Sequence, residues 1–370
     1  MNKERLVPQL RFKGFEGEWE KKTFGDVFNY ERPDKYIVDS DEYDTVGTPV
    51  LTANKSFVLG YTHEDGAYDK GDSVIFDDFT LDSKYVDFNY KVKSSALKIL
   101  TAKQGNLRYL YELLASTHIN QEGHSRHYIS VVQPFKIKVA PLDEQQKIGS
   151  FFEKMDKLIE FYKSNIQNKI LYKKSILQKI IPRQESGFAR LRFNYFSDKW
   201  NSKKIKNIAD ILDNKRVPIT ASKRENGKIP YYGANGIQDY VKNYTHEGFF
   251  TLIAEDGASD VLDYPVYYVE GKIWVNNHAH VLSGKNHVAD TRFLSVILKC
   301  VDYSKYVTGG GRKKLNGNVL KTISIKIPSL PEQQKIGQLF QKLDQEINLY
   351  EQKIEQLKQL KKGYLQKLFC

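Results

Sequence analysis

The amino-acid sequence predicts an α+β protein in which one half of the chain duplicates the other, and each half consists of a β-rich domain followed by a long helix. The hexapeptide EQQKIG occurs twice, starting at Glu144 and at Glu332. Segment 145–181 aligns with 333–369 without a gap, at an offset of 188 residues. Near the start of each half, LRFKGFEGEW also lies over LRFNYFSDKW. A repeat of about half the chain indicates two copies of one structural unit.

The amino-acid composition limits the classes of protein to which the chain can belong. The chain of 370 residues is 40% hydrophobic and 13% aromatic, which is enough for the cores of two or three domains. No apolar run approaches the roughly 18 residues of a membrane span, and the start, MNKERLVPQL, lacks the apolar core of a secretory signal. The two cysteines, Cys300 and Cys370, have no metal-ligand spacing, so we expect a cytoplasmic protein without zinc or a disulfide framework. A formal net charge of +12 favours a polyanionic partner, above all nucleic acid.

The first half begins with a domain at residues 1–142. GDSVIF and FKIKVA have the β-branched and aromatic composition of strands, and RYLYELLAS (108–116) has apolar residues at helical spacing. A long helix is predicted at 143–181, and Pro182 ends it. Its apolar stripe, spaced by three and four residues, consists of Ile148, Phe152, Met155, Ile159, Tyr162, Ile166, Ile170, Leu177 and Ile180.

The second half repeats this order. Its domain, at residues 182–328, contains the strand-like runs FFTLIA, YPVYYV and TISIKI and a predicted helix at 292–301. The helix at 329–370 holds a more regular heptad than the first. Two helices of almost 40 residues are each too long for one small domain to cover, so we expect them to pair as a coiled coil. The alternative is that each apolar stripe packs on its own domain.

This order of parts resembles a known family. Two domains of this size, each preceded by LRF and Trp and followed by a long helix that opens with P-x-x-E-Q or L-P-E-Q-Q, are similar to the DNA specificity subunit of type I restriction–modification enzymes. The resemblance covers nearly the whole chain. It implies two pseudo-twofold-related α/β target recognition domains, at 1–142 and 182–328, separated by two long antiparallel coiled-coil helices, a central one at 143–181 and a C-terminal one at 329–370. Each domain would bind one half of a bipartite, asymmetric DNA site, and the helices would act as the spacer.

The resemblance also implies partners. In this family the helices bind two copies of an adenine methyltransferase (modification) subunit, to which restriction and translocase subunits can be added. S-adenosylmethionine would then belong to the methyltransferase and ATP with Mg²⁺ to the restriction subunit, with no cofactor in this chain. For partner docking we single out the duplicated polar residues that open the two helices: Glu144, Gln145, Gln146, Glu332, Gln333 and Gln334.

The sequence favours a subunit without catalytic activity. It has no GxxxxGK[ST] or GxGxxG motif for nucleotides and no [DN]-P-P-[YF] motif of the kind that amino-methyltransferases use. Three alternatives stay open. One is a stand-alone nuclease, for which a D-x-K match at Asp82 and the PD pair at Pro33 are weak signals, because such short matches occur by chance in a lysine-rich chain. A stand-alone methyltransferase and a coiled-coil scaffold are the others. His278 and His280 are candidate metal ligands, although a structural role is the simpler interpretation.

DNA binding requires cations for phosphates and forked polar groups for base edges. TGGGRKKLN is the strongest local candidate, because glycines allow a close backbone approach and three cations follow them. At the repeat offset of 188, Arg126 and His127 fall over Lys314 and Leu315. Carboxylates that follow strand-like runs, at Asp78 and Glu255 among others, can accept from cytosine N4. The predicted DNA-binding residues, each with a solvated loop as the alternative, are Asn54, Lys55, Lys84, Tyr85, Arg126, His127, Lys215, Arg216, Asn235, Asn276, Asn277, Arg312, Lys313 and Lys314.

Overall fold

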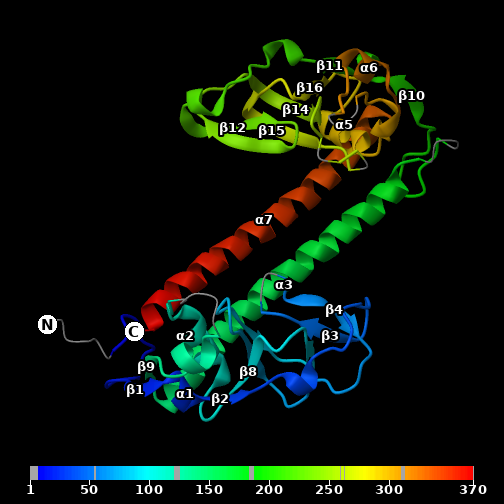
Figure 1. The fold of residues 1–370 in the computed structure, drawn as a ribbon. Helices are drawn as coiled ribbons and strands as arrows, with labels where there is room; N and C mark the ends of the chain where they lie inside the picture. Colours follow the sequence, from blue (N-terminus) through cyan, green and yellow to red (C-terminus); the bar gives the residue numbers. More distant parts are fainter. Residues whose placement is uncertain are drawn as a thin grey trace. The chain divides into compact units, whose positions relative to one another are not determined.

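The structure, a computed structural model, describes residues 7–53, 56–120, 126–182, 187–258, 260–261, 263–309 and 313–369. Contacts divide the chain into two units: Met1–Ser164 with Glu351–Cys370, called unit 1, and Asn165–Tyr350, called unit 2. The two long helices labelled α3 and α7 in Figure 1 each contribute to both units. The predicted helical segments are therefore shared between the units rather than separate from them.

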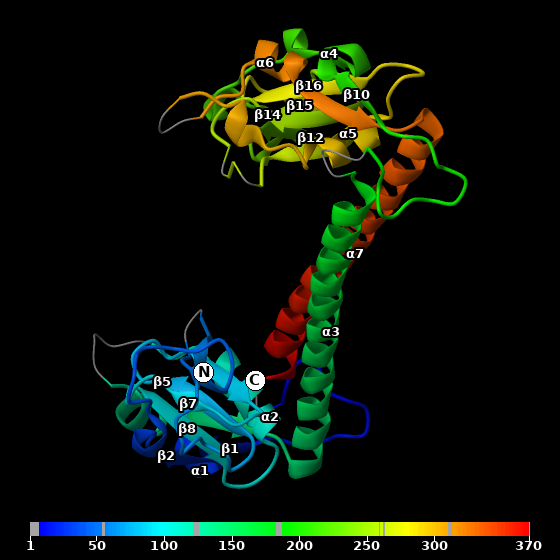
Figure 2. The same ribbon diagram turned by 90° about the vertical axis from the view of Figure 1, so that its right-hand side faces the viewer.

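Unit 1 combines three small sheets with short helices and parts of both long helices (Figure 2). Its elements are β1 (Glu20–Thr23), α1 (Phe24–Val27), β2 (Phe28–Glu31), η1 (Asp34–Tyr36), β3 (Thr48–Leu51), β4 (Val58–Thr62), β5 (Ser73–Asp77), β6 (Ser83–Val86), β7 (Lys91–Val92), β8 (Leu97–Ala102), α2 (Leu107–Ser116), η2 (Tyr128–Val132), β9 (Lys136–Val139) and α3 (Leu142–Ile180). The sheets have the orders β2-β8-β5-β6, β4-β3-β7 and β1-β9. The strands predicted from GDSVIF and FKIKVA are confirmed as β5 and β9, and the predicted helix is confirmed as α2.

Unit 2 contains one larger sheet. Its elements are β10 (Asn201–Lys204), α4 (Ile205–Ile208), β11 (Ala209–Ile211), η3 (Asp213–Lys215), η4 (Ala221–Lys223), β12 (Asn226–Gly233), β13 (Gly236–Val241), β14 (His246–Ala254), β15 (Val266–Val275), β16 (Ala279–Gly284), α5 (Thr291–Leu298), η5 (Tyr303–Lys305), α6 (Gly317–Thr322), β17 (Ser324–Ile327) and α7 (Leu330–Leu368). Six strands have the order β11-β16-β14-β15-β12-β13, and β10 pairs with β17. The three strands and the short helix predicted here are confirmed as β14, β15, β17 and α5.

The two units repeat one plan, with a difference in the sheet. Strand β1 pairs antiparallel with β9 as β10 pairs with β17. In unit 1, β6 pairs with β5, and the separate strand β7 pairs in parallel with β3. In unit 2, the single long strand β15 does both, because it pairs antiparallel with β14 and in parallel with β12. Because β15 is continuous, these strands of unit 2 form one sheet, whereas the equivalent strands of unit 1 form two separate sheets.

The long helices pair within each unit. In unit 1, the ring centroids of Phe151 and Tyr364 lie 4.9 Å apart. In unit 2, Lys169 forms an ion pair with Glu346 and Lys173 forms one with Asp344. Positions rise along α3 as they fall along α7, so the paired segments are antiparallel and the predicted pairing is confirmed. The alternative, that the apolar stripe packs on its own domain, also holds for the N-terminal turns of α3, because Phe152 is buried in the core of unit 1.

Each core is closed by a helix end that comes from the other half of the chain. In unit 1, the ring of Phe369, next to the end of α7, lies 6.4 Å from Trp19, 5.5 Å from Tyr109 and 6.1 Å from Phe152. In unit 2, Ile176 and Ile180 of α3 belong to the core that contains Trp200 and Phe293. The first half of the chain therefore needs the end of the second half to complete its core, and the second needs the end of α3.

Candidate nucleic-acid interface

Three loops meet where strand β14 of unit 2 ends, a place that we call the β14 junction. The backbone N–H of Glu255 donates to the carbonyl of His278 at 2.8 Å, and the Glu255 carbonyl accepts from the N–H of Leu315 at 2.6 Å. The backbones of Thr308 and Lys314 exchange two hydrogen bonds, at 2.8 and 2.9 Å. These bonds fix the loop after β14 against the start of β16 and against the residues that follow the predicted glycine-rich loop.

The same arrangement occurs in unit 1 at the end of β5, which we call the β5 junction. The backbone N–H of Asp78 donates to the carbonyl of Ala96 at 3.0 Å, and the Asp78 carbonyl accepts from the N–H of His127 at 3.1 Å. Asp78 thus corresponds to Glu255, and His127 corresponds to Leu315. The sequence alignment that set Arg126 over Lys314 is therefore confirmed by equivalent backbone bonds.

Two predicted DNA-binding cations gather around one carboxylate at the β14 junction. Arg216 Nη1 donates to Glu255 Oε2 at 2.7 Å, and Lys314 Nζ lies 3.0 Å from Glu255 Oε1. Burial alone would raise the pKa of Glu255, but hydrogen bonds from Arg216 and Lys314 bring this pKa below its ordinary value. Arg216 Nη1 also donates to the carbonyl of Ala279 at 2.9 Å. Glu255 thus holds both cations in the DNA-free protein.

A second polar pair, His280 with Asp213, lies beside the ion pairs of Glu255. The Nδ1 atom of His280 lies 2.6 Å from Asp213 Oδ2, and its Nε2 lies 2.8 Å from the carbonyl of Leu315. Burial would raise the pKa of Asp213, but the hydrogen bond and electrostatic interaction with His280, together with the hydrogen bond from the backbone N–H of Val281, bring this pKa below its ordinary value. Ligand atoms of Asp213, Glu255 and His280 lie within 4.8 Å of one another, as a metal site would require. Since cationic donors already occupy both carboxylates, and both His280 nitrogens face acceptors, we assign the cluster to ion pairing. The prediction of a structural role for His280 agrees with this arrangement.

The β5 junction holds its charges differently. Lys98 Nζ lies 3.1 Å from Asp78 Oδ2, and these side chains are only 3% and 2% exposed. Asp78 Oδ1 also accepts from the backbone N–H of Tyr128 at 2.7 Å. Arg126 is exposed, and its Nη2 lies 3.4 Å from the hydroxyl of Ser95. Lys98 was missed from the sequence, although a lysine inside the apolar run LKIL is a signal for a buried ion pair.

Two predicted DNA-binding residues are buried, which corrects the prediction for them. His127 has no exposed surface, and its Nδ1 lies 3.1 Å from the carbonyl of Asp78. Asn276 is 3% exposed, accepts from the N–H of His278 at 2.8 Å and donates to Gln238 at 3.3 Å. Both side chains have a structural role, because they form hydrogen bonds with loop backbone or with a neighbouring amide, and buried polar groups require such partners.

The remaining predicted residues are distributed over several places. Exposed side chains are found at Lys215, Asn235, Asn277 and Lys313. The Asn235 amide donates to the carbonyl of Gly257 at 2.9 Å, two residues beyond Glu255. The Asn277 carbonyl accepts a long bond of 3.5 Å from Arg216. The predicted residues Asn54, Lys55 and Arg312 lie outside the described residues.

Lys84 and Tyr85 lie on β6 and line a hollow of about 1150 Å³ bounded by α2, α3 and the C-terminal part of α7. The Tyr85 hydroxyl donates to Asp72 at 2.5 Å, and the guanidinium of Arg108 lies 4.9 Å from the Tyr85 ring centroid. Arg108 also forms ion pairs with Glu112 and Asp156. The structure therefore places Lys84 and Tyr85 beside the long helices, whereas Arg126 lies at the β5 junction.

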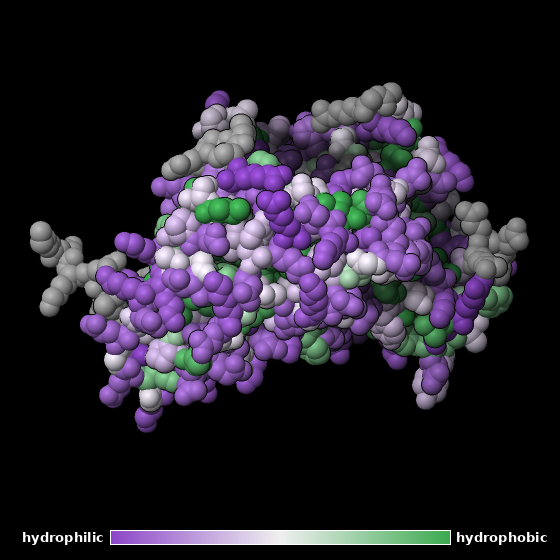
Figure 3. Space-filling view, turned by 60° about the horizontal axis from the view of Figure 1, so that its bottom comes forward, coloured by the Kyte–Doolittle hydropathy of each residue, from purple (hydrophilic) through white to green (hydrophobic). Residues whose placement is uncertain are grey.

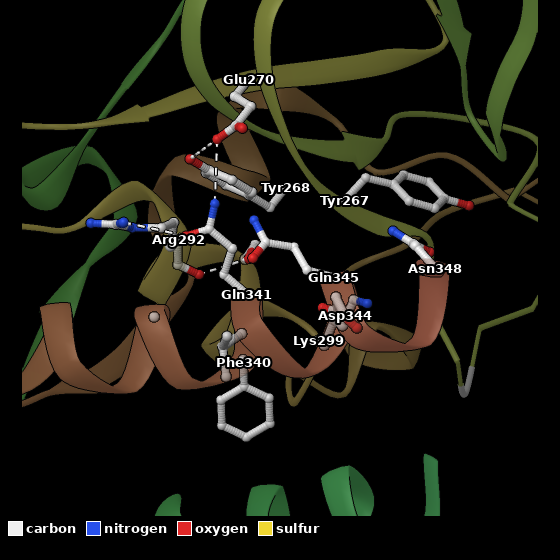
Figure 4. A pocket seen from close by; sticks show the side chains of 13 residues that line it. Tyr267, Tyr268, Glu270, Arg292, Lys299, Phe340, Gln341, Asp344, Gln345 and Asn348 are labelled. Carbon is white, nitrogen blue, oxygen red and sulfur yellow. Dashed lines mark hydrogen bonds between the residues drawn. The ribbon is translucent and has the colours of Figure 1, made fainter. Parts of the chain in front are cut away.

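An equivalent hollow of about 390 Å³ lies in unit 2 between β15, α5 and α7 (Figure 4). Figure 4 shows Glu270 accepting from the Tyr268 hydroxyl at 3.1 Å and from the Gln341 amide at 3.3 Å. Arg292 Nη1 donates to Gln341 at 3.3 Å. Arg292 occupies the second position of α5, as Arg108 occupies the second position of α2. These bonds join β15 and α5 to α7 across the hollow.

The glutamates of the duplicated hexapeptide form internal bonds. Glu144 accepts from Arg11 Nε at 2.8 Å and Nη2 at 2.7 Å, and Glu332 accepts from Arg192 Nε at 2.9 Å and Nη2 at 2.6 Å. Both carboxylates are almost fully buried. These forked pairs tie the LRF segment of each half to the start of its long helix. The repeated LRF and EQQ motifs are therefore two parts of one contact.

The next residues of the hexapeptide join the short helix to the long one. Gln145 accepts from the N–H of Asn106 at 3.2 Å, and Gln333 accepts from the N–H of Asp290 at 3.1 Å. Gly149 leaves no room for a Cβ atom, which would lie 2.1 Å from Asn106 Oδ1. The docking prediction is corrected for four buried residues with these internal roles, and it stays a prediction for the exposed Gln146 and Gln334. The four buried residues are Glu144, Gln145, Glu332 and Gln333.

One face of the molecule is mainly polar. Figure 3 shows one face of the molecule on which hydrophilic residues predominate and hydrophobic residues form small separate patches. Within the described part of the chain, no helix combines the length and apolar content that a membrane crossing requires.

Comparison with known proteins gives a consistent result. A family model described as the type I restriction modification DNA specificity domain matches residues 16–172 and 197–359, one match in each half. A Haemophilus influenzae protein named as a candidate type I restriction enzyme specificity subunit is 43% identical over 141 residues, which are 38% of this chain and 36% of the relative. A type I restriction enzyme specificity subunit of Escherichia coli is 41% identical over 143 residues, 36% of this chain and 35% of the relative. Each of these alignments spans about a third of the relative's length.

A solved structure shares the fold over nearly the whole chain. The type I restriction–modification system S subunit from M. genitalium superimposes with a TM-score of 0.76 and covers 98% of this chain and 99% of that one. The two sequences are 16% identical, so the likeness concerns the fold. It supports the expected arrangement of two α/β domains with two long helices.

Proposed function

The chain belongs to the type I restriction modification DNA specificity family, and from this premise we propose that it binds double-stranded DNA for a methyltransferase, each unit contacting one half of a bipartite, asymmetric site. The observation that carries the proposal is the repetition of one backbone junction with unlike side chains. The β5 junction presents Arg126 beside the buried Lys98–Asp78 pair, whereas the β14 junction presents Lys314 and Arg216 around Glu255. Equivalent frames with different polar groups suit two unlike half-sites, since base edges differ in their donors and acceptors.

The exposed groups at the junctions have the chemistry that DNA requires. Arg126 in unit 1 and Lys215, Lys313 and Lys314 in unit 2 supply cations for phosphates. Asn277 is an exposed amide at the β14 junction, and amides can form paired hydrogen bonds with adenine. The net charge of +12 favours the approach of a polyanion to both units.

Two identical partner subunits require surface residues that both units present. Lys147 and Lys335 are exposed at equivalent positions, and each ammonium lies 6.0 Å from a ring, of Phe12 or Phe193. Packing of the core does not require these lysines to be identical. They form the docking surface for two copies of an adenine methyltransferase subunit, together with equally exposed and identical residues two turns or less away: Gln146, Lys154, Gln334 and Lys342.

In this proposal the chemistry belongs to the partners. The methyltransferase holds S-adenosylmethionine, restriction and translocase subunits use ATP with Mg²⁺, and this chain contributes recognition in the cytoplasm without catalysis. The proposal is supported by the family match in both halves and by the exposed cations at the two junctions.

The first experiment compares the purified chain with the chain mixed with its methyltransferase, using genomic DNA and radiolabelled S-adenosylmethionine. We expect no methyl transfer by the chain alone and site-selective adenine methylation by the mixture. Methyl transfer or cleavage by the pure chain would support the stand-alone enzyme instead. A chain that neither binds DNA nor directs methylation would support the scaffold alternative.

The docking surface has its own test. Replacing Lys147 and Lys335 together by glutamate is expected to weaken methyltransferase binding in an interaction assay at least tenfold, because both copies lose a cation from the interface. Replacing Lys35 of unit 1 and Lys228 on β12 of unit 2 together by glutamate changes two equally exposed lysines and serves as the charge-matched control. Equal effects of the control and of the double variant would assign the loss to overall charge and reject the surface.

A further inference from the structure

We infer that Glu255 is a specificity-determining residue of unit 2, because its carboxylate holds Arg216 and Lys314 in the DNA-free protein and thereby weakens contact with phosphates of any sequence. The inference rests on the proposed DNA binding. In this view Glu255 lowers the affinity of unit 2 for DNA of any sequence. Strong binding then requires contacts with bases in addition to contacts with phosphates. Non-specific affinity in such proteins arises almost entirely from phosphate contacts.

The geometry leaves neither carboxylate oxygen without a cation. Arg216 Nη1 is bonded to Oε2 at 2.7 Å, and Lys314 Nζ lies 3.0 Å from Oε1. The Glu255 side chain is 13% exposed, so water screens these two ion pairs less than it screens pairs at the open surface. The backbone of Glu255 is fixed by two hydrogen bonds, to His278 and Leu315, and the contacts with Arg216 and Lys314 orient its carboxylate. An anion is thus held where a DNA phosphate would otherwise meet both cations.

The two cations differ in how firmly they are held. Arg216 is 14% exposed, donates from Nη1 to the carbonyl of Ala279 and from Nε to the carbonyl of Asp213 at 3.2 Å, and is part of the junction. The Lys314 side chain is 51% exposed, while its backbone is fixed by the two bonds to Thr308. Its ammonium can therefore leave Glu255 without any change in the loop. Lys314 is the cation whose availability Glu255 controls.

Unit 1 has no equivalent arrangement among its described residues. The corresponding carboxylate, Asp78, is occupied by the buried Lys98 and by the N–H of Tyr128. The cation that corresponds to Lys314 is Arg126, and it bonds to the hydroxyl of Ser95 rather than to a carboxylate. A neutral hydroxyl competes weakly with phosphate for a guanidinium. The control of a cation by a carboxylate is thus a property of unit 2.

The expected size of the effect follows from counterion release. Each phosphate neutralised by a protein cation contributes a slope of about −0.9 to the dependence of log affinity on log salt concentration, or about eightfold in affinity at 0.1 M relative to 1 M salt. A lysine already paired with a carboxylate must give up that pair before it contributes. Removing the carboxylate charge therefore gives one additional phosphate contact.

The test is a double-mutant cycle in the full chain with a mixed-sequence DNA duplex of about 40 base pairs as the probe, titrated at several salt concentrations between about 50 and 200 mM. Glu255→Gln keeps the size of the side chain and is expected to bind the duplex fivefold to tenfold more tightly at 0.1 M salt, with a salt slope steeper by about one. Lys314→Gln is expected to weaken binding by about twofold in the native chain and by about eightfold in the Glu255→Gln background.

An unchanged affinity and slope for a folded Glu255→Gln variant overturn the inference. A loss of fivefold or more for Lys314→Gln in the native chain also overturns it, because Lys314 would then reach phosphates despite Glu255. This second variant decides the question even where Glu255→Gln fails to fold, since a loss of about twofold or less supports the inference. A native chain that binds no duplex at low salt rejects the proposed function as well, whereas native binding without coupling rejects the inference alone.

Discussion

The β5 junction of unit 1 and the β14 junction of unit 2 have two equivalent backbone hydrogen bonds, at Asp78 and at Glu255. They differ in how far the charged side chains around these two carboxylates are exposed. In unit 1, Lys98 and Asp78 are 3% and 2% exposed, so water and ions have no access to the pair. In unit 2, Glu255 meets a partly buried Arg216 on one side and a half-exposed Lys314 on the other. A duplicated frame can therefore carry a fixed structural pair in one copy and an exchangeable cluster in the other. Unlike half-sites require this freedom to differ at equivalent positions.

The units also differ in where their closing helix comes from. The core of unit 2 is completed by the end of α3, which precedes the sheet of unit 2 in the chain, whereas the core of unit 1 is completed by the end of α7, which follows that sheet. The core of unit 1 therefore cannot be complete until α7 is present. The following predictions use these differences, from the largest expected effect to the smallest.

Removing residues 351–370 is expected to unfold unit 1 and to leave unit 2 folded. The deletion removes Leu368 and Phe369 from the core of unit 1, and losing two such side chains costs roughly 5 to 10 kcal/mol, comparable to the stability of a whole domain. Hydrogen exchange followed by mass spectrometry measures both units in one sample, with a chain ending at Phe369 as the control. Native protection of β5 and β8 in the truncated chain would contradict the account of the shared core.

Asp78→Asn is expected to destabilise unit 1 by about 3 to 5 kcal/mol, because it leaves the buried Lys98 ammonium without a carboxylate. The matched change in unit 2, Glu255→Gln, is expected to cost about 1 kcal/mol or less, since Arg216 keeps other acceptors and Lys314 can turn to water. Denaturant-dependent hydrogen exchange gives both values. Equal losses of stability in the two units would contradict the distinction between the buried Lys98–Asp78 pair and the partly exposed pairs of Glu255.

Acid is expected to weaken the β14 junction slightly. The pKa values of Glu255 and Asp213 lie below their ordinary values of 4.5 and 3.8, so both carboxylates stabilise the fold at neutral pH. This contribution is lost as the pH falls through the folded pKa values, which lie below these numbers. Glu255→Gln should therefore show a shallower loss of stability in unit 2 below about pH 4.5, by up to about 1 kcal/mol. A variant whose stability falls as steeply as that of the native chain would contradict the assignment of these shifts.

Much of the fold could be predicted from the sequence, because the internal duplication is recognisable in the order of the amino acids. The ungapped match of 145–181 with 333–369 predicted two equal long helices, and the apolar stripes predicted their pairing. The strands with β-branched residues were equally evident. The joining of the sheet of unit 2 through β15 was not, since strand pairing depends on contacts between distant residues.

The site was predicted less well, for a physical reason. Residue type and sequence position identified Arg216 and Lys314 as candidate DNA-binding cations, but they could not show that Glu255 lies between them. His127 and Asn276 were taken for surface residues because a polar side chain in a loop looks the same whether it faces water or the loop's own backbone. The EQQ motif suggests a docking site in the sequence because its internal partners are distant: those of the two glutamates lie more than 100 residues away, and Asn106 and Asp290 lie 39 and 43 residues from the glutamines that they bond.

The most direct test of the central claim is an exchange of residues 201–328 for the corresponding segment of another family member, followed by sequencing of the methylated sites in cells that contain the methyltransferase partner. The segment carries the β14 junction and its sheet and leaves unit 1 and both long helices unchanged, apart from the helix contacts that the new segment makes. We predict that one half of the methylated motif changes and that the other half stays as it was. A change in both halves, or in neither, in a folded chain that still binds its methyltransferase would contradict the claim that each unit binds its own half-site.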